Sequence, residues 1–308
     1  MRSKGEVKKK RKWVRNILFI IILLIVIIST FIIYQYRSGV LESAKDVNYE
    51  GREDYDFLSV EPPQGEMNVL LIGSDSRGEA HSRSDTLMIA NYNSNNNKIK
   101  IASIMRDTYV DVPGHGLQKI NAAFAFGGPE LVRQTIKENF DIDVNYYVIV
   151  DFKGFSKLVD IITPEGIQVD IPYEMSYGIG TVLEPGSQTL HGKDLLGYVR
   201  FRHDRLSDFG RVERQQEVMS KLKEQAISAH SLYNLPKIVG LAIPYIDTNL
   251  DTQSILSLSK GLFLNSTDGL DSLRIPVQDS YENDVTNVGA VLKTDLDTNK
   301  EALSSFFN

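Results

Sequence analysis

Three apolar runs lie between positions 67 and 108, separated by charged and turn-forming residues. The run at 68–72 is almost wholly apolar, which is typical of a buried central strand. The runs at 86–90 and 99–105 are separated by the turn sequence NSNNN at 93–97. This pattern predicts a buried strand followed by a β-hairpin.

Charged residues border these runs where the strands would end. If the hairpin turn is centred near Asn95 and Asn96, paired positions sum to roughly 191. This register places Asp85 opposite Arg106, and a first strand lying beside the second would bring Asp75 to the same end. Two interpretations remain open: a functional site of converging carboxylates and arginines, or surface salt bridges at strand ends, which are common and weak.

Downstream of the hairpin, predicted strands and helices alternate, as they do in α/β proteins. A helix start is indicated by the Gly-Gly-Pro-Glu sequence at 127–130. The tail after Asp279 is polar and is expected to be loosely held. The fold class is therefore α/β, with a mixed central β-sheet flanked by helices (α/β/α). The patterns predict strands at 144–150, 167–171 and 270–277, helices at 155–162 and 251–263, and a helix end with a loop at 225–244.

A second basic cluster lies at 198–216, with the sequence YVRFRHDRLSDFGRVERQQ. If 198–202 is extended, Arg200 and Arg202 point to one face. A helix is predicted to follow, with Asp208 as its N-cap.

This helix carries cations where they are unfavourable. Arg211 and Arg214 lie in its first turns, where the helix dipole is already positive and the backbone amides are unpaired. Converging arginines at a helix N-terminus are well suited to phosphate. Either the cluster binds an anionic ligand, or it is a solvated face neutralised by its acidic neighbours, which are Asp208, Glu213 and Glu217.

The N-terminal pattern predicts a membrane anchor. Residues 1–15 carry eight basic side chains and one acidic one, and residues 17–34 carry no charge. At 1.5 Å per residue that uncharged run spans about 27 Å, close to a bilayer core of about 30 Å. The apolar region of a cleaved signal peptide is shorter, about 7–15 residues. We therefore predict a cytoplasmic basic tail (1–15), one N-terminal transmembrane helix (16–36), an extracytoplasmic linker (37–65) and an extracytoplasmic folded domain (66–308).

Composition narrows the possible partners of the outer domain. The full chain has a net charge of −6, but the part after the tail has 26 basic and 39 acidic residues, a net charge of −13. A domain of that charge has no general attraction for nucleic acid, so we expect no nucleic-acid partner. The chain has no cysteine, which excludes disulfides and zinc–thiolate sites.

Several catalytic motifs do not occur in the sequence. It lacks the P-loop pattern, the dinucleotide-binding fingerprint and the G-x-S-x-G nucleophile elbow. A glycosidase pair of Asp75 and Asp85 is disfavoured, because the nearby arginines would keep both carboxylates ionised. Ionised carboxylates beside a bound phosphate are instead suitable oxygen ligands for Mg²⁺.

The motifs taken together resemble the LytR-CpsA-Psr family of cell-wall glycopolymer ligases. They are GSDSR, RSDT, SIMRDTYVDVPG, KINAAFAFGG, DFKGFSKLVD and YVRFR…DFGRVERQQEV, in this order between positions 67 and 225. One departure is Met105, where the family often has a proline before the arginine. The resemblance implies transfer of a polyprenyl-pyrophosphate-linked glycopolymer (wall teichoic acid or capsule) to the C6 hydroxyl of a peptidoglycan muramic acid. It also implies the cell membrane of a Gram-positive-type bacterium.

The resemblance also implies roles for individual residues. Asp75 and Asp85 would hold Mg²⁺ (or Mn²⁺), and these two would act with Arg106 and Arg211 in catalysis. A long apolar groove would hold the lipid between the sheet and the helices, with Phe152, Phe155 and Val159 as candidates that ordinary core packing would equally explain. The pyrophosphate would be bound by Arg83, Arg106, Arg200, Arg202, Arg211 and Gln215.

A second function class fits the same residues. The protein could hold a polyprenyl-phosphate lipid at the membrane, without turnover, as a binding or regulatory protein of envelope maintenance. A covalent polymer–glycan product would identify the ligase, and retained lipid without product would identify the binding protein.

Overall fold

A six-stranded mixed sheet forms the centre of the computed structural model, which describes residues 4–45, 55–63, 65–74, 84–96, 98–229, 234–264 and 270–308. Its strand order is β10-β3-β2-β1-β6-β9. Neighbours β1, β2 and β3 are antiparallel, whereas β6 on β1 and β10 on β3 are parallel, which confirms the predicted mixed sheet. The strands are β1 (Glu66–Ser74), β2 (Ser84–Asn93), β3 (Lys98–Ile104), β6 (Tyr146–Asp151), β9 (Asp247–Thr248) and β10 (Asp271–Ile275).

The predicted hairpin register is confirmed. Leu87 pairs with Ile104 and Ala90 with Ile101, and each pair of positions sums to 191. Strand β1 lies beside β2 on its other edge, with Gly73 opposite Thr86. The register is fixed because a slip of one residue would move every apolar side chain of the hairpin to the other face.

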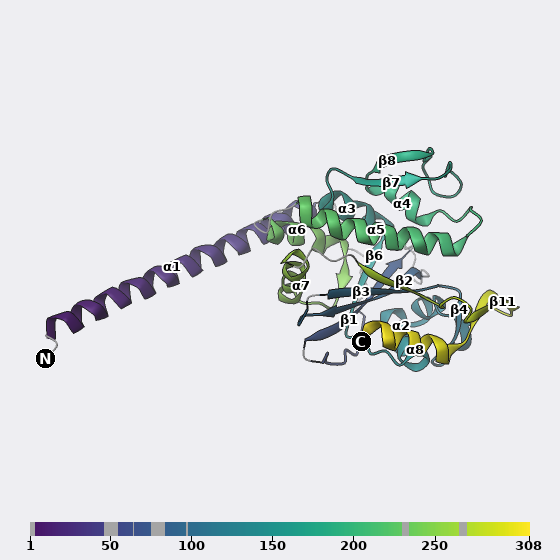
Figure 1. Ribbon diagram of the computed structural model, residues 1–308, viewed down its shortest axis with the longest axis horizontal. Coiled ribbons are helices and arrows are strands. Elements are labelled where there is room, and N and C mark those ends of the chain that lie inside the picture. The colour runs from purple at the N-terminus through teal and green to yellow at the C-terminus, as the bar shows by residue number, and fades with distance from the viewer. Residues whose placement is uncertain are drawn as a thin grey trace.

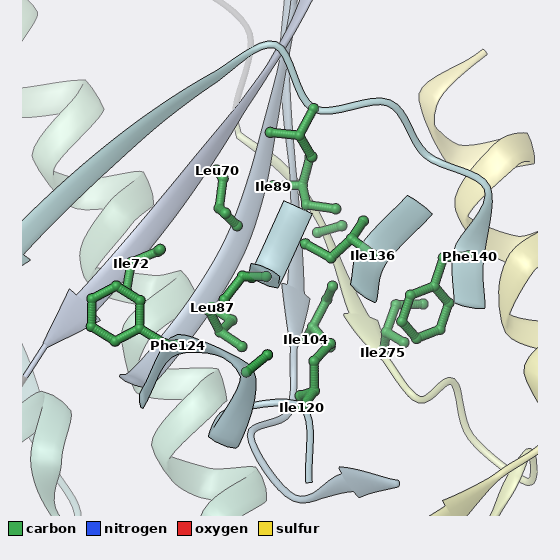
Figure 2. Packing of buried hydrophobic residues seen from close by; sticks show 14 of the residues in the cluster. Leu70, Ile72, Leu87, Ile89, Ile104, Ile120, Phe124, Ile136, Phe140 and Ile275 are labelled. Carbon is green, nitrogen blue, oxygen red and sulfur yellow. The ribbon is translucent and has the colours of Figure 1, made fainter. Parts of the chain in front are cut away.

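Alternation along the strands gives the sheet two apolar faces. Leu70, Leu87 and Ile104 point to one face and pack with Ile136 and Phe140 in a continuous core (Figure 2). Helices α2 (Ala122–Phe140) and α8 (Leu296–Phe307) cover this face (Figure 1). The opposite face is covered by α3 (Phe152–Ile162), α4 (Gly192–Arg200), α5 (Asp208–Ala229), α6 (Leu235–Ala242), the 3-10 turn η1 (Ile243–Tyr245) and α7 (Thr252–Leu264).

Two smaller sheets flank this sandwich. One contains β4 (Thr108–Val112), β5 (Gly116–Lys119), β11 (Tyr281–Thr286) and β12 (Gly289–Thr294) in the order β11-β12-β4-β5. The other pairs β7 (Ile167–Ile171) with β8 (Gly186–Leu190). The strand predicted at 167–171 is therefore confirmed, but it lies outside the central sheet.

The prediction of an extended segment at 198–202 is wrong. Residues 192–200 form helix α4, and Phe201 is the first extended residue after it. A second core lies between α3, α4, α5 and the β7–β8 pair. The helix is favoured because Leu195, Tyr198 and Val199, spaced i, i+3 and i+4, are all buried in this second core. Arg200 therefore ends a helix and Arg202 lies in the loop beyond it, so the two do not share the face of a strand.

The prediction of a loosely held tail after Asp279 is also wrong. Strands β11 and β12 form a hairpin there, and α8 follows, with the Asp295 carboxylate accepting from the backbone N–H of Thr298 as its N-cap. Leu303 is fully buried in the main core, and Phe306 and Phe307 pack against that core. A few apolar side chains are enough to anchor this segment, so its polar composition gave no indication that it is ordered.

One buried amide fixes this C-terminal segment to the sheet. Asn299 is fully buried; its Oδ1 accepts from Val277 N at 2.8 Å and its Nδ2 donates to Ser280 Oγ at 2.7 Å. We expect Asn299→Ala to lower the free energy of unfolding by about 1–3 kcal/mol, because the backbone N–H of Val277 and the buried hydroxyl of Ser280 each lose a hydrogen-bond partner. Thermal unfolding of the detergent-solubilised full chain measures this. Asn308→Ala, at the exposed end of the same helix, is the control and should unfold like the parent.

Helix α2 begins earlier than predicted. It starts at Ala122, and its backbone leaves helical geometry at Gly127 and Gly128 before resuming at Pro129. The Gly-Gly-Pro-Glu signal thus marks a second start within one element rather than the first. Gly128 has φ 61°, and a Cβ there would lie 2.7 Å from the Tyr55 ring, so glycine is required at this position on both grounds.

The N-terminal apolar run forms helix α1 (Lys4–Ser43), and its stretch Trp13–Ser43 is long and apolar enough to cross a membrane. Figure 1 shows α1 projecting away from the domain as a single rod. The described parts of the predicted linker, 37–65, are attached to the domain rather than extended as a stalk. Residues at the end of α1 pack on α6, and Tyr55 and Phe57 pack against the main core.

Candidate functional site

The predicted pair of Asp85 and Arg106 is the centre of a charged cluster at one end of the hairpin. Asp85 Oδ1 accepts from Arg106 Nη1 at 2.7 Å and from Arg202 Nη2 at 3.0 Å, and Arg211 Nη1 lies 3.8 Å from it. These side chains come from β2, the turn after β3, the loop after α4 and the first turn of α5. The structure thus brings Arg106, at the end of the hairpin, together with Arg202 and Arg211 of the second basic cluster, which are 95 or more residues away in the sequence.

Asp208 is a further member of the cluster, which the sequence predicted as an N-cap and as one of three possible neutralising neighbours of the arginines, but not as a site residue. It lies in the first turn of α5. Its Oδ2 accepts from Arg211 Nη2 at 2.9 Å, and its Oδ1 lies 3.6 Å from Arg106 Nε and 3.7 Å from Arg202 Nε. Its spacing of three residues from Arg211 was the available signal, since i, i+3 pairs are neighbours on a helix.

The electrostatics of the cluster favour an added anion. Burial tends to raise the pKa of Asp85, but the charges of Arg202, Arg106 and Arg211 hold it below 3.8, so Asp85 stays ionised at neutral pH. Burial lowers the pKa of the Arg211 guanidinium to about 10; Asp208 opposes this shift, and Arg202 and Arg106 add to it. Arg211 is 2% exposed, so it is a desolvated cation pressed against two others. A bound anion would relieve that repulsion.

Unused hydrogen-bond donors mark where such an anion would lie. In the described part of the chain, Arg106 Nε, Arg202 Nε, and both Nε and Nη1 of Arg211 are buried without a hydrogen bond. Arg106 Nε and Arg202 Nε face Asp208 Oδ1, which is itself unbonded, at the ion-pair distances of 3.6 and 3.7 Å. Buried donors in native proteins are nearly always paired, so a group of orphaned ones requires an explanation. Guanidinium forks are suited to phosphate oxygens because they donate two parallel bonds.

Arg200 and Gln215 lie beside the cluster, at the ends of interior strands of the sheet. Gln215 Nε2 donates to Thr86 Oγ1 at 3.0 Å, which fixes the amide next to Asp85. The guanidinium of Arg200 lies 4.1 Å from the centre of the Phe152 ring, a cation–π contact. Two further predicted site residues, Asp75 and Arg83, lie outside the described residues, so their predicted roles stay predictions.

Arg214 has a structural position instead. It donates to the carbonyl oxygens of Phe201 and Tyr198 and to Asp204 Oδ2, the last at 2.7 Å. The two arginines at the start of α5 therefore have different partners: Arg214 is neutralised by Asp204, whereas Arg211 retains unpaired donors. Arg214 ties α5 to the loop that carries Arg202.

An apolar cavity of about 580 Å³ opens next to the charged cluster, between the sheet and the helices on its second face. Met88, Ala90 and Val148 of the sheet line its floor, on the face opposite the main core. Along α5 the lining runs from Arg211 to Lys223, about 18 Å of helix at 1.5 Å per residue. The groove candidates Phe152, Phe155 and Val159 all line it, and its charged end contains Asp85, Arg200, Arg202, Arg211 and Gln215.

The oxygen ligands of the site are sufficient for Mg²⁺ only if substrate phosphate oxygens complete the set. The described residues contain no group of three or more potential ligands placed to hold a metal ion. Asp85 meets Arg106, Arg202 and Arg211 through Oδ1, which leaves its second oxygen unused by them. Because Mg²⁺ is commonly held by one or two carboxylates plus substrate phosphates, this donor set fits such a site.

Comparisons with known proteins agree on one protein family. A model of the LytR_cpsA_psr family matches residues 30–305. Regulatory protein MsrR of Staphylococcus aureus (strain COL) is 39% identical over 282 residues, covering 90% of this chain and 85% of that protein. The polyisoprenyl-teichoic acid–peptidoglycan teichoic acid transferase TagU of Oceanobacillus iheyensis is 32% identical over 265 residues, covering 82% and 81%.

A solved structure shares the fold. It is the LytR-CPS2A-psr family protein YwtF (TagT) with bound octaprenyl pyrophosphate lipid, a protein of Bacillus subtilis. The TM-score is 0.60 at 25% sequence identity, and the match covers 85% of this chain and 98% of that one.

Proposed function

The chain belongs to the LytR_cpsA_psr family, and on that premise we propose that it transfers an anionic glycopolymer from a polyprenyl-pyrophosphate carrier to peptidoglycan. The polymer is wall teichoic acid or a capsular polysaccharide, and the acceptor is the C6 hydroxyl of muramic acid. The observation that carries the proposal is that an apolar cavity ends at buried guanidinium groups with unused donors. An isoprenoid chain ending in pyrophosphate has the complementary chemistry, apolar along its length and doubly anionic at its head.

The TagU relative supports the reaction class and the TagT structure supports the ligand. The first is named as a teichoic acid transferase acting on peptidoglycan. The second holds octaprenyl pyrophosphate.

The reaction needs one bond made and one broken. The acceptor hydroxyl oxygen attacks the phosphorus on the sugar side of the pyrophosphate, and the bond from that phosphorus to the bridging oxygen breaks. Polyprenyl phosphate leaves with the bonding electrons, and the hydroxyl proton passes to a base. Negative charge grows on the bridging oxygen, and Arg106, Arg202 and Arg211, which converge on Asp85 Oδ1, would stabilise it. Such preorganised donors stabilise the transition state without having to reorient.

The protein side chains divide this work between them. The cavity lining holds the isoprenoid chain, and Gln215 with Arg200 borders the head group. Asp85 spaces the three guanidinium groups around one oxygen, and its depressed pKa makes it a weak proton acceptor. Mg²⁺, held by Asp85 and Asp75 together with phosphate oxygens, would supply additional positive charge at the pyrophosphate.

A second candidate function has its own observation. The relative of 39% identity is named a regulatory protein, and the same cavity and arginines would hold a polyprenyl phosphate without turning it over. Nothing in the binding chemistry separates the two functions, because both require the apolar cavity and the anion site.

Turnover separates them. The detergent-solubilised full chain is incubated with Mg²⁺, a lipid-linked glycopolymer and a peptidoglycan oligomer, and the products are resolved by gel and mass spectrometry. We expect a covalent polymer–glycan phosphodiester together with free polyprenyl phosphate. Retained lipid without a covalent product, over many hours and with intact protein, would refute the transferase and support the binding protein.

A further inference from the structure

Helix α6 has two occupied faces. Ile238, Val239 and Ala242 on one face line the cavity, at the end away from the charged cluster. The other face packs on the C-terminal end of α1, the helix that contains the membrane-spanning stretch (Figure 1). One short helix therefore joins the lipid cavity to the membrane anchor.

The contact between these two helices depends on two glycines. A Cβ at Gly39 of α1 would lie 2.8 Å from the backbone N of Leu241 and 3.0 Å from the carbonyl carbon of Gly240. A Cβ at Gly240 of α6 would meet the carbonyl oxygen of Tyr36 and lie 3.2 Å from Val40 N. Because the obstructing atoms are backbone, neither helix can yield by turning a side chain aside. The glycines permit a backbone-to-backbone crossing that larger residues would prevent.

Polar contacts around the crossing fix its orientation. Lys237 Nζ of α6 lies 3.0 Å from Glu42 Oε2 of α1. The Tyr36 hydroxyl lies 3.3 Å from Thr252 Oγ1, at the first residue of α7. Helix α7 also lines the cavity, through Ile255 and Ser259. The end of α1 is thus attached to both helices that form this end of the cavity.

The distance of the crossing from the end of the apolar run places it relative to the bilayer. The apolar run of α1 ends at Tyr34, and Gly39 is five residues further on, a rise of about 7.5 Å along the helix. The polar headgroup layer on one side of a bilayer is about 5–8 Å thick. Helix α6 therefore lies at the level where the headgroups meet water.

From this geometry we propose that the Gly39–Gly240 crossing seats the α6–α7 end of the cavity on the bilayer surface, so that the isoprenoid chain enters from the membrane beneath α6. The inference rests on the proposed lipid substrate and adds its route of entry. Entry at this end keeps the apolar chain out of water, and the pyrophosphate reaches the arginines at the other end. The crossing acts on loading of the cavity and touches no reacting atom.

The contact itself can be tested without any activity. The full chain is reconstituted into phosphatidylglycerol vesicles and treated with a zero-length carbodiimide, which joins salt-bridged amines to carboxylates. Mass spectrometry should find an amide between Lys237 and Glu42 in the parent and lose it in Gly240→Leu. Absence of this amide from the parent, while the Lys119–Asp107 pair at 2.7 Å is coupled, would overturn the proposal.

The consequence is tested by comparing two donors. In Gly39→Leu the folded domain is unchanged in sequence. We expect the rate of transfer from a long-chain polyprenyl donor in vesicles to fall by about tenfold or more, because the helix crossing no longer holds the cavity entrance at the bilayer and the effective concentration of donor lipid at that entrance falls. Transfer from a farnesyl-chain donor in detergent should stay at the parent level. Leu41→Ala, on the exposed side of the same helix, is the control and should match the parent with both donors.

Each other outcome opposes the proposal. Equal loss with both donors in Gly39→Leu would mean that the crossing supports the fold, and no loss with the vesicle donor would mean that entry does not depend on it. If the parent itself transfers nothing, the proposed function fails. Entry is then measured as the amount of fluorescent polyprenyl phosphate that moves from vesicles into the protein and exchanges only slowly. Gly39→Leu should take up about tenfold less of this lipid than the parent.

Discussion

Arg211→Ala is expected to lower the rate of glycopolymer transfer by about 10²–10³-fold, the cost of removing one preorganised donor from a site of developing negative charge. Arg211 is 2% exposed and has two donors without acceptors, so it is the most desolvated cation of the cluster. Its loss removes stabilisation at the pyrophosphate that water cannot replace. Initial rates with the detergent-solubilised full chain at saturating donor measure the effect.

Two further variants make this result specific. Arg211→Lys should also be poor, because an ammonium group cannot reproduce the paired donors of a guanidinium. Arg205→Ala removes an exposed arginine from the same basic segment and should transfer at the parent rate. The fold should survive in Arg211→Ala, since Asp208 keeps Arg106 at 3.6 Å and Arg202 at 3.7 Å as partners. Near-normal turnover by folded Arg211→Ala would exclude this site.

The local part of this site could be predicted from the sequence. A turn centred at 95–96 fixes the hairpin register, and the register alone brings Asp85 to Arg106. This succeeds because strand pairing is a rule of sequence position, with few alternatives once the turn is known. The mixed sheet and the helices on its two faces could be predicted for the same reason, from periodicity and the order of elements.

The contribution of α4 and α5 was harder to predict. The five residues 198–202 fit both an extended and a helical pattern, and burial of Leu195 and Val199 in the second core decides for a helix that ends at Arg200. That Arg202 nevertheless reaches Asp85 depends on tertiary packing, in which buried Arg214 donates to the carbonyl oxygens of Tyr198 in α4 and Phe201 in the loop. The spacing of residues within the segment contains no such information.

The cavity and the α6 crossing lie furthest from what sequence reasoning can reach. Residues 225–244 suggested a helix end and a loop, yet they contain α6, which is only eight residues long. The apolar residues that line the cavity, such as Val148 and Leu222, have the same pattern as residues that fill a core. Whether such side chains meet or leave a space depends on distances between elements, which the alternation of apolar and polar positions does not encode.

Asp85→Asn is expected to lower turnover by about 10²-fold while leaving donor binding equal or tighter. The amide retains an oxygen that can accept from Arg106 and Arg202, so the geometry at 2.7 and 3.0 Å can persist. It loses the negative charge that spaces the guanidinium groups and that the proposed Mg²⁺ site requires. Steady-state rates across a Mg²⁺ titration should show a lower maximum and a higher Mg²⁺ requirement than in the parent.

The pH profile and a neighbouring carboxylate distinguish this role from a general loss of charge. Because the three arginines hold the pKa of Asp85 below 3.8, the parent should lose no activity through Asp85 between pH 8 and about pH 5, and any fall in that range belongs to another group. Asp107→Asn makes the same charge change beside Arg106, but Asp107 pairs chiefly with Lys119 at 2.7 Å. It should therefore leave the Mg²⁺ requirement unchanged. An Asp85→Asn enzyme with the Mg²⁺ requirement of the parent would show that Asp85 orders the arginines without holding the metal, since charge spacing alone depends on no divalent ion.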